Sequence, residues 1–391
     1  MNEFNQTFPF SPIDYIFTGT GSQPITFAFY YPEKQSEEKL ISSLNEALKH
    51  YTILKSRLKR ISKTNFVFDI CNDTLQIEIH KLTSDFNNND NITRYISPVK
   101  SIDGYPLVKI TLTHFNKGSV LALSISHTLV DGFSYFHFLS SWVRICKNEK
   151  FILPYIDRNL FSSFIQTNDK EVTKDDLLNN CGLFYGKKRT DSESTENHRE
   201  FIRAETIKEI SVRARNKNIL LTENDVITGM LWKKFMTSWN KKNSNTETYL
   251  TFPFDFRRVL NGFPKNYFGC AITFGTAKLS LWELAEKAEE EIAVYVKSSV
   301  SKIKNDYINT ALNTLENFRN QKGNDEFEKL HLRHSENGII ITNISRLPVH
   351  ELDFGEGEPT QVLTYNKVPG SVAILPAQGG VEILAASPII Y

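Results

Sequence analysis

Residues 119–132 read SVLALSISHTLVDG, and this stretch decides both the fold and the chemistry expected of the chain. The run SVLALSIS is apolar and rich in β-formers, so it predicts a buried strand that stops at His127. After Asp131 and Gly132, residues 133–147 have an aromatic face and predict a helix. We expect Gly132 to supply a backbone angle that other residues resist.

His127 is a candidate general base. The ordinary imidazole pKa of about 6.5 allows a proton to be accepted near neutral pH and then returned. Asp131 is placed either to orient the imidazole or to brace the turn. The pattern H-x-x-x-D-G is expected only about 0.03 times by chance at average residue usage. The alternative is a histidine that serves only the structure of a strand-to-helix turn.

The sequence on either side of this stretch mixes strands and helices. Residues 106–115 predict a partner strand, joined to the central run by Asn116-Lys117-Gly118 in a hairpin. Apolar spacing predicts helices over residues 36–51, 222–240 and 281–304, the last followed by another through Phe318. Further strands are expected at residues 25–31, 249–254, 338–344, 360–365, 372–375 and 381–385.

Residues 186–198 (GKKRTDSESTENH) contain no large apolar side chain and are the best candidate linker. Strands and helices are mixed on both sides of this segment, which lies near the middle of the chain. We therefore expect two α/β lobes of similar size.

Composition bounds the function. The 391 residues carry a net charge of +1, which gives no electrostatic reason to expect nucleic acid or a membrane surface as a partner. The four cysteines are widely spaced, so we expect neither disulfides nor a zinc site. This spacing is typical of a protein in a reducing compartment. No secretory signal and no membrane-spanning run is expected. These features predict a cytoplasmic protein without a metal.

A second motif, Asp353-Phe354-Gly355-Glu356-Gly357, predicts a tight loop. Together with H-x-x-x-D-G, it resembles the BAHD family of acyl-CoA-dependent acyltransferases. Other family-like segments follow in the family's order: SPID at 11–14, the helix from Thr222 to Trp232, DFR at 255–257, PKNYFG at 264–269, the run from Thr342 to Pro348, and GGVE at 379–382. The resemblance spans essentially the whole chain.

The resemblance implies two chloramphenicol-acetyltransferase-like lobes, each a mixed sheet with flanking helices, and an active-site tunnel between them. The expected organisation is a first lobe in residues 1–185, a linker in 186–200, and a second lobe in 201–350 and 372–391. Residues 351–371 are expected to cross over to the first lobe. A monomer is sufficient for this arrangement.

The resemblance also implies roles for single residues. His127 is the general base that deprotonates the acceptor, and Thr342 is the candidate donor to the oxyanion. Asp131 is expected to pair with Arg257, and both are structural, as are Gly132, Gly355 and Gly357. Asp353 is expected to be a brace, although a catalytic role is the alternative. Acyl-CoA is a co-substrate rather than a bound cofactor, and the acceptor is a small-molecule alcohol or amine.

Three residues depart from the family pattern: Ile344 and Glu356 stand in place of tryptophans, and Asn266 in place of a glycine. O-acyl transfer is the leading hypothesis. A second is N-acyl transfer or a condensation-type reaction with a carrier-protein thioester. Ser126 counts against the latter, since condensation domains usually carry a second histidine there. A third is a binding protein that kept the fold and lost turnover.

Overall fold

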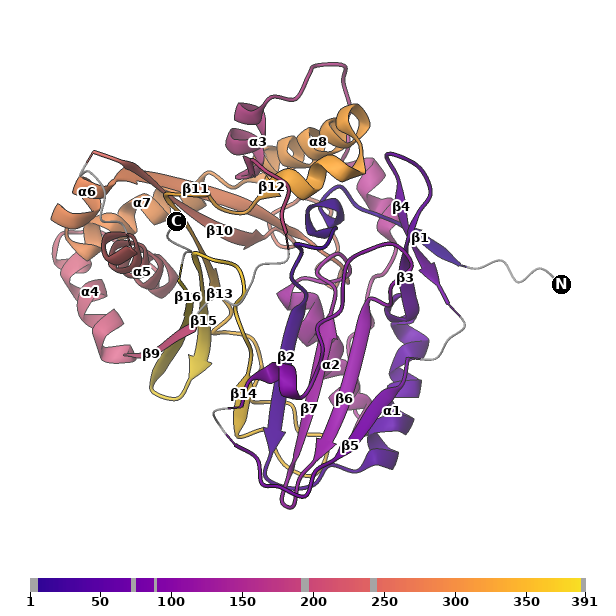
Figure 1. The fold of residues 1–391 in the computed structure, drawn as a ribbon. Helices are drawn as coiled ribbons and strands as arrows, with labels where there is room; N and C mark the ends of the chain where they lie inside the picture. Colours follow the sequence, from indigo (N-terminus) through magenta and orange to yellow (C-terminus); the bar gives the residue numbers. More distant parts are fainter. Residues whose placement is uncertain (1–5, 72–74, 88–89, 191–196, 240–244, 388–391) are drawn as a thin grey trace.

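The computed structural model describes residues 6–71, 75–87, 90–190, 197–239 and 245–387. The described strands form four sheets, of which a five-stranded and a six-stranded sheet are the largest. These two sheets occupy different halves of the molecule, and helices accompany each of them (Figure 1). The mixed α/β architecture expected from the sequence is therefore confirmed.

The five-stranded sheet has the strand order β14-β2-β7-β6-β5. Its strands are β2 (Ile25–Tyr31), β5 (Ile77–Lys81), β6 (Val108–His114), β7 (Ser119–Ile125) and β14 (Gln361–Leu363). All seven residues of β7 are buried, as its unbroken apolar run predicts. Two helices accompany this sheet and contact each other, α1 (Glu37–His50) and α2 (Gly132–Cys146).

The six-stranded sheet has the order β11-β10-β13-β15-β16-β9 and mixes parallel with antiparallel pairs. Its strands are β9 (Asn197–Arg203), β10 (Glu247–Asp255), β11 (Ile272–Ser280), β13 (Gly338–Asn343), β15 (Ser371–Ala377) and β16 (Gly380–Ala386). The helices in this half are α4 (Ala204–Asn216), α5 (Glu223–Trp239), α6 (Leu281–Glu286) and α7 (Glu289–Ser301).

Smaller elements complete the described fold. A three-stranded sheet contains β1 (Thr7–Pro9), β3 (Ser56–Arg60) and β4 (Phe66–Ile70), and a two-stranded one contains β8 (Phe184–Tyr185) and β12 (Leu330–His331). Helices α3 (Lys174–Cys181) and α8 (Asn305–Lys322) pack together at the top of Figure 1. The 3-10 helices are η1 (Asp14–Phe17), η2 (Thr52–Lys55), η3 (Ile92–Arg94), η4 (Arg158–Ser163) and η5 (Asn324–Lys329).

The chain crosses between the large sheets near its C-terminus. β13 and β15 lie in the six-stranded sheet, whereas β14, which lies between them in sequence, pairs antiparallel with β2 at the edge of the five-stranded sheet. The segment that contains the D-F-G-x-G motif therefore runs from one sheet to the other.

One helix prediction was wrong. Residues 281–304 form not one long helix but two, α6 and α7, because Lys287 is extended. A new helix begins after Ala288, whose backbone N–H donates to the Glu291 carboxylate at 3.0 Å. Acidic residues 289–291 fill its first turn, where the helix dipole favours negative charge.

One end of the segment expected to be a linker belongs to a strand. Residues 191–196 lie outside the described residues, while residues 197–200 begin β9, which pairs with β16. β9 (NHREFIR) is an edge strand with mostly exposed side chains, so it lacks the apolar run that identifies a buried strand.

Candidate active site

His127 lies in the turn that joins β7 to α2, with its ring against the ring of Phe17 in η1. The two ring centroids are 3.9 Å apart and the planes differ by 8°. His127 is partly exposed, but its Nδ1 atom is buried and makes no hydrogen bond to another described residue. The Nδ1 edge thus faces the protein, and Nε2 has no hydrogen-bond partner among the described residues.

The surroundings of His127 favour the neutral imidazole. Burial lowers the pKa of His127 below its ordinary value, while a contact with its own backbone and the charge of Asp131 act in the opposite direction. Because the net shift is downward, the ring is uncharged at neutral pH and is competent to accept a proton.

Asp131 caps α2 and does not hydrogen-bond to His127. Its Oδ1 accepts the N–H of Ser134 at 2.9 Å, and its Oδ2 accepts the N–H of Ala271 at 2.9 Å. Its Oδ2 also lies 2.7 Å from Nη1 of Arg257, and both side chains are almost completely buried. Burial alone raises the pKa of Asp131, but Arg257 and the two N–H donors outweigh it and hold the pKa below its ordinary value.

Arg257 ties the start of α2 to the segment 264–269. Its Nε donates to the Tyr267 carbonyl at 3.0 Å, and its Nη2 donates to the Gly269 carbonyl at 2.9 Å. The hydroxyl of Ser134 lies within hydrogen-bonding distance of the same glycine. Asp131 and Arg257 therefore join the start of α2 to the segment 264–269.

A second buried ion pair lies beside the same turn. Arg158 and Asp14 are both fully buried and in direct contact. The Arg158 Nη2 donates to the Leu129 carbonyl at 2.9 Å, and the Asp14 Oδ2 accepts the N–H of Ser11 at 2.7 Å. Asp14 was part of a recognised segment, whereas Arg158 and Phe17 were missed, because nothing in their local sequence distinguishes them.

Gly132 does not serve the purpose we expected. It is the first residue of α2 and has no positive φ. A Cβ at this position would lie 3.5 Å from the Leu347 side chain, an ordinary contact. A glycine is not needed here for its backbone angle, because Asp131 as N-cap already makes the turn into the helix.

Thr342 lies on β13, where it pairs with Ala373 of β15, and its side chain is partly buried. The loop that follows β13 reaches the start of α2, since Leu347 lies beside Gly132. In the described residues no hydrogen bond or ring contact joins Thr342 to His127. The structure thus brings the loop after β13, rather than Thr342 itself, to the start of α2.

The loop of the D-F-G-x-G motif lies at the far end of α2. Asp353 Oδ1 accepts the N–H groups of Gly355 and Gly357 at 2.7 and 2.9 Å, and its Oδ2 lies 3.0 Å from Nζ of Lys147. Both glycines have positive φ, of 110° and 98°, which glycine adopts without strain. Lys147 follows the last residue of α2, whereas His127 precedes its first, and 15 helical residues span about 22 Å.

We predict that Asp353→Ala destabilises the loop and leaves the chemistry nearly intact. The variant removes the acceptor of two backbone N–H groups, so the free energy of unfolding should fall by about 1–3 kcal/mol. Urea denaturation and turnover, measured on the same preparation, check this. A loss of kcat as large as that of a His127 variant would instead support a catalytic role.

Two of the departures from the family pattern have local partners. Glu356 forms an ion pair with Lys39 of α1 at 2.6 Å. Asn266 donates from Nδ2 to the Leu153 carbonyl at 2.9 Å, and its φ is not positive, so a glycine is not required there. The Ile344 side chain is partly buried against the main core.

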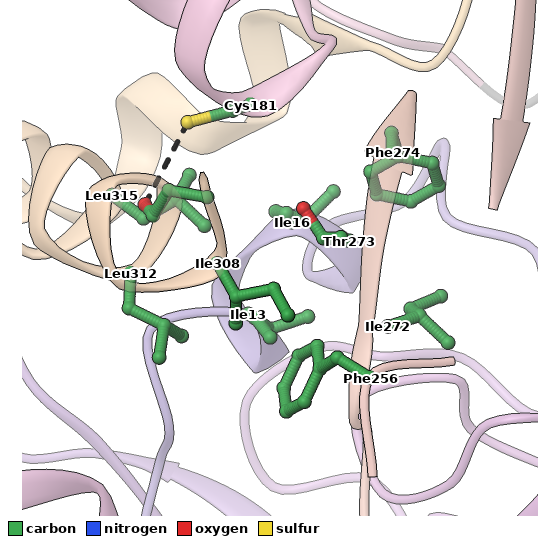
Figure 2. A pocket seen from close by; sticks show the side chains of 11 residues that line it. Ile13, Ile16, Cys181, Phe256, Ile272, Thr273, Phe274, Ile308, Leu312 and Leu315 are labelled. Carbon is green, nitrogen blue, oxygen red and sulfur yellow. Dashed lines mark hydrogen bonds between the residues drawn. The ribbon is translucent and has the colours of Figure 1, made fainter. Parts of the chain in front are cut away.

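An apolar cavity lies behind η1, between α8 and β11 (Figure 2). Ile13, the N-cap of η1, and Ile16, within η1, line it, and the Cys181 thiol at its margin contacts the Ala311 carbonyl at 3.7 Å. Its volume is about 10 Å³, the space of roughly one water molecule, and its lining is almost entirely apolar. It is too small to receive a substrate.

Two further features of the described part of the chain concern a metal site and a membrane-spanning helix. There, no group of three or more His, Cys, Asp or Glu side chains is arranged to hold a metal ion. Among the described helices, none combines the length and the apolar character needed to cross a membrane.

A model of the Transferase family, the BAHD acyltransferases, matches residues 2–388. The chain belongs to this family. An anthranilate N-benzoyltransferase of Dianthus caryophyllus is 25% identical over 370 residues, covering 87% of this chain and 80% of the relative. A fatty alcohol:caffeoyl-CoA acyltransferase of Arabidopsis thaliana is 23% identical over 362 residues, covering 86% and 80%.

Solved structures agree with the BAHD fold. TRI101 of F. graminearum in complex with ethyl coenzyme A superimposes with a TM-score of 0.79 at 13% identity, covering 99% of this chain and 96% of that one. Vinorine synthase superimposes with a TM-score of 0.75 at 15% identity, covering 100% of this chain and 92% of that one. The predicted family, the chloramphenicol-acetyltransferase-like fold and the acyltransferase class are confirmed.

Proposed function

We propose that this BAHD acyltransferase moves an acyl group from acyl-CoA to a hydroxyl of a small-molecule acceptor, with His127 as the general base. The observation that carries the proposal is a partly exposed imidazole at the turn into α2, whose Nε2 has no hydrogen-bond partner among the described residues and whose pKa is lowered by burial. An amine acceptor is the alternative. The relatives include both an N-benzoyltransferase and an enzyme named for a fatty alcohol.

The reaction follows from the chemistry of His127. Its Nε2 accepts the proton of the acceptor O–H while the oxygen attacks the thioester carbonyl carbon. A tetrahedral oxyanion forms, and we assign its hydrogen-bond donor to Thr342. Collapse of the oxyanion breaks the C–S bond, and the CoA thiolate takes the proton from the imidazolium. A thiol of pKa about 8.5 leaves readily, so no stronger acid is needed.

The ion pairs around the turn have a supporting role in this proposal. Asp131 and Arg257 hold the start of α2, Asp353 braces the loop at its far end, and neither carboxylate touches the reacting atoms. We further propose a tunnel between the two lobes that admits donor and acceptor from opposite sides. A monomeric, cytosolic enzyme without a metal cofactor fits this proposal.

The pH dependence of turnover tests the state of His127. Since burial lowers the pKa of His127, kcat/KM should stay constant on lowering the pH below the ordinary value of about 6.5 and fall only at more acid pH. Initial rates between pH 4.5 and 8, with stability checked at each pH, measure this fall of kcat/KM on the acid side. An acid limb centred above 6.5 would contradict it.

Free thiol release from a panel of acyl-CoAs, acetyl to aromatic, with pooled alcohols and amines, tests the function. We expect acceptor-dependent release, and mass spectrometry of the product then separates ester from amide. Transfer from a carrier-protein thioester but not from acyl-CoA would favour the condensation-type reaction. Failure to bind any acyl-CoA would leave a non-catalytic binding protein.

A further inference from the structure

We propose that Phe17 is the positioning residue for His127, and that the buried pair of Asp14 and Arg158 holds Phe17 in place. This inference rests on the proposed role of His127 as general base. It assigns a function in catalysis to the segment 11–18, which lies more than a hundred residues before the histidine in the sequence.

The first step of the argument is that Asp131 does not orient the imidazole. A catalytic histidine is commonly fixed by a carboxylate that accepts the N–H of the other ring nitrogen. Here both oxygens of Asp131 are engaged by Arg257 and by the N–H groups of Ser134 and Ala271. His127 Nδ1 has no hydrogen bond to another described residue and meets only its own backbone, so neighbouring side chains must help to set the ring orientation.

The second step is that Phe17 supplies this packing. Rotation of an imidazole about χ2 is only weakly restricted by its own bonds. The Phe17 ring, 3.9 Å away, favours orientations of His127 in which the two ring planes are nearly parallel. The same ring excludes water from one face of the imidazole, and this desolvation favours its neutral form.

The third step is the anchoring of Phe17. It is the last residue of η1, and the first, Asp14, forms the buried ion pair with Arg158. Arg158 donates in turn to the carbonyl of Leu129, two residues after His127. The stacked ring and the guanidinium thus connect η1 to the catalytic turn at two points.

The cavity shows why this anchor is needed. Ile13, just before η1, and Ile16, within it, line the small apolar cavity (Figure 2). The hydrophobic contacts on that side are not directional. The ion pair is directional and fully buried, so it fixes the position that packing leaves open.

Phe17→Leu tests the proposal. We expect kcat to fall by about 10–100-fold, because displacing a catalytic group by about 1 Å reduces the rate by up to this factor. We also expect the pKa of His127 to rise toward its ordinary value, read from the NMR titration of its ring Cε1–H, a signal assigned by its absence in His127→Gln. Phe17→Tyr keeps the ring and should lie closer to the wild type in both measurements.

The matched control is Phe27→Leu. Phe27 is 5% exposed and Phe17 4%, and Phe27 packs against Tyr135 and Phe136 of α2 rather than against His127. The Phe27→Leu variant should have a lower free energy of unfolding but an unchanged pKa of His127. The proposal is overturned if Phe17→Leu leaves that pKa unchanged, or if Phe27→Leu shifts it equally. The NMR titration needs no turnover, so it decides the role of Phe17 even if no acyl-CoA proves to be a substrate.

Discussion

His127→Ala is expected to reduce kcat by about 10²–10⁴-fold, the usual contribution of a positioned general base. The acceptor hydroxyl would keep its proton during attack on the thioester, while the sites for donor and acceptor would remain. KM should therefore change much less than kcat, because the loss is confined to the transition state. Thiol release at saturating acyl-CoA and acceptor measures the effect.

A matched histidine variant supports this test. His80 lies on β5 with about half of its side chain exposed, so His80→Ala removes an imidazole elsewhere in the same sheet. We expect wild-type turnover from it. If His127→Ala also turned over at the wild-type rate, with an unchanged circular dichroism spectrum, the general-base mechanism would be wrong.

Asp131→Ala is expected to lower the free energy of unfolding by about 3–5 kcal/mol, the range measured when one partner of a buried ion pair is removed. The variant leaves the Arg257 guanidinium buried without its main counter-charge. It also removes the side-chain cap of α2 and the acceptor of the Ala271 N–H. Urea denaturation at neutral pH, with the slope compared between variants, measures the loss.

An exposed pair provides the comparison. Glu247 and Lys278 lie 3.0 Å apart at the surface of the six-stranded sheet, so Glu247→Ala should cost far less than Asp131→Ala. The double variant Asp131→Ala/Arg257→Met should recover part of the loss, because it leaves no unpaired buried charge. Equal losses from Asp131→Ala and Glu247→Ala would contradict a bracing role.

Helices and strands that are specified by neighbouring residues in the sequence could be predicted well. The buried strand β2 was predicted at its observed limits, and α1 begins after Ser36, whose side chain accepts the N–H of Lys39. These elements depend on apolar periodicity and on caps, both of which are written in neighbouring residues. The break at Lys287 was missed because the apolar pattern continues on both sides of it.

Elements defined by their partners could not be predicted. β9 is a strand because it pairs with the edge of β16. β14 joins the five-stranded sheet because it pairs with the edge of β2. Neither has an apolar run of its own that marks which sheet it joins. The pairing of β14 was within reach only through the family resemblance, which implied that this segment crosses over.

By itself the sequence determined the family, the strand that ends before His127, the helix that follows it, and the identity of the catalytic candidate. Tertiary structure alone decided what surrounds that candidate: the ring of Phe17, the guanidinium of Arg158, and the distance of Asp353 from the chemistry. The physical reason is that backbone periodicity and capping act between near neighbours. Burial, ring stacking and ion pairing are set by which distant segments the closed fold brings together.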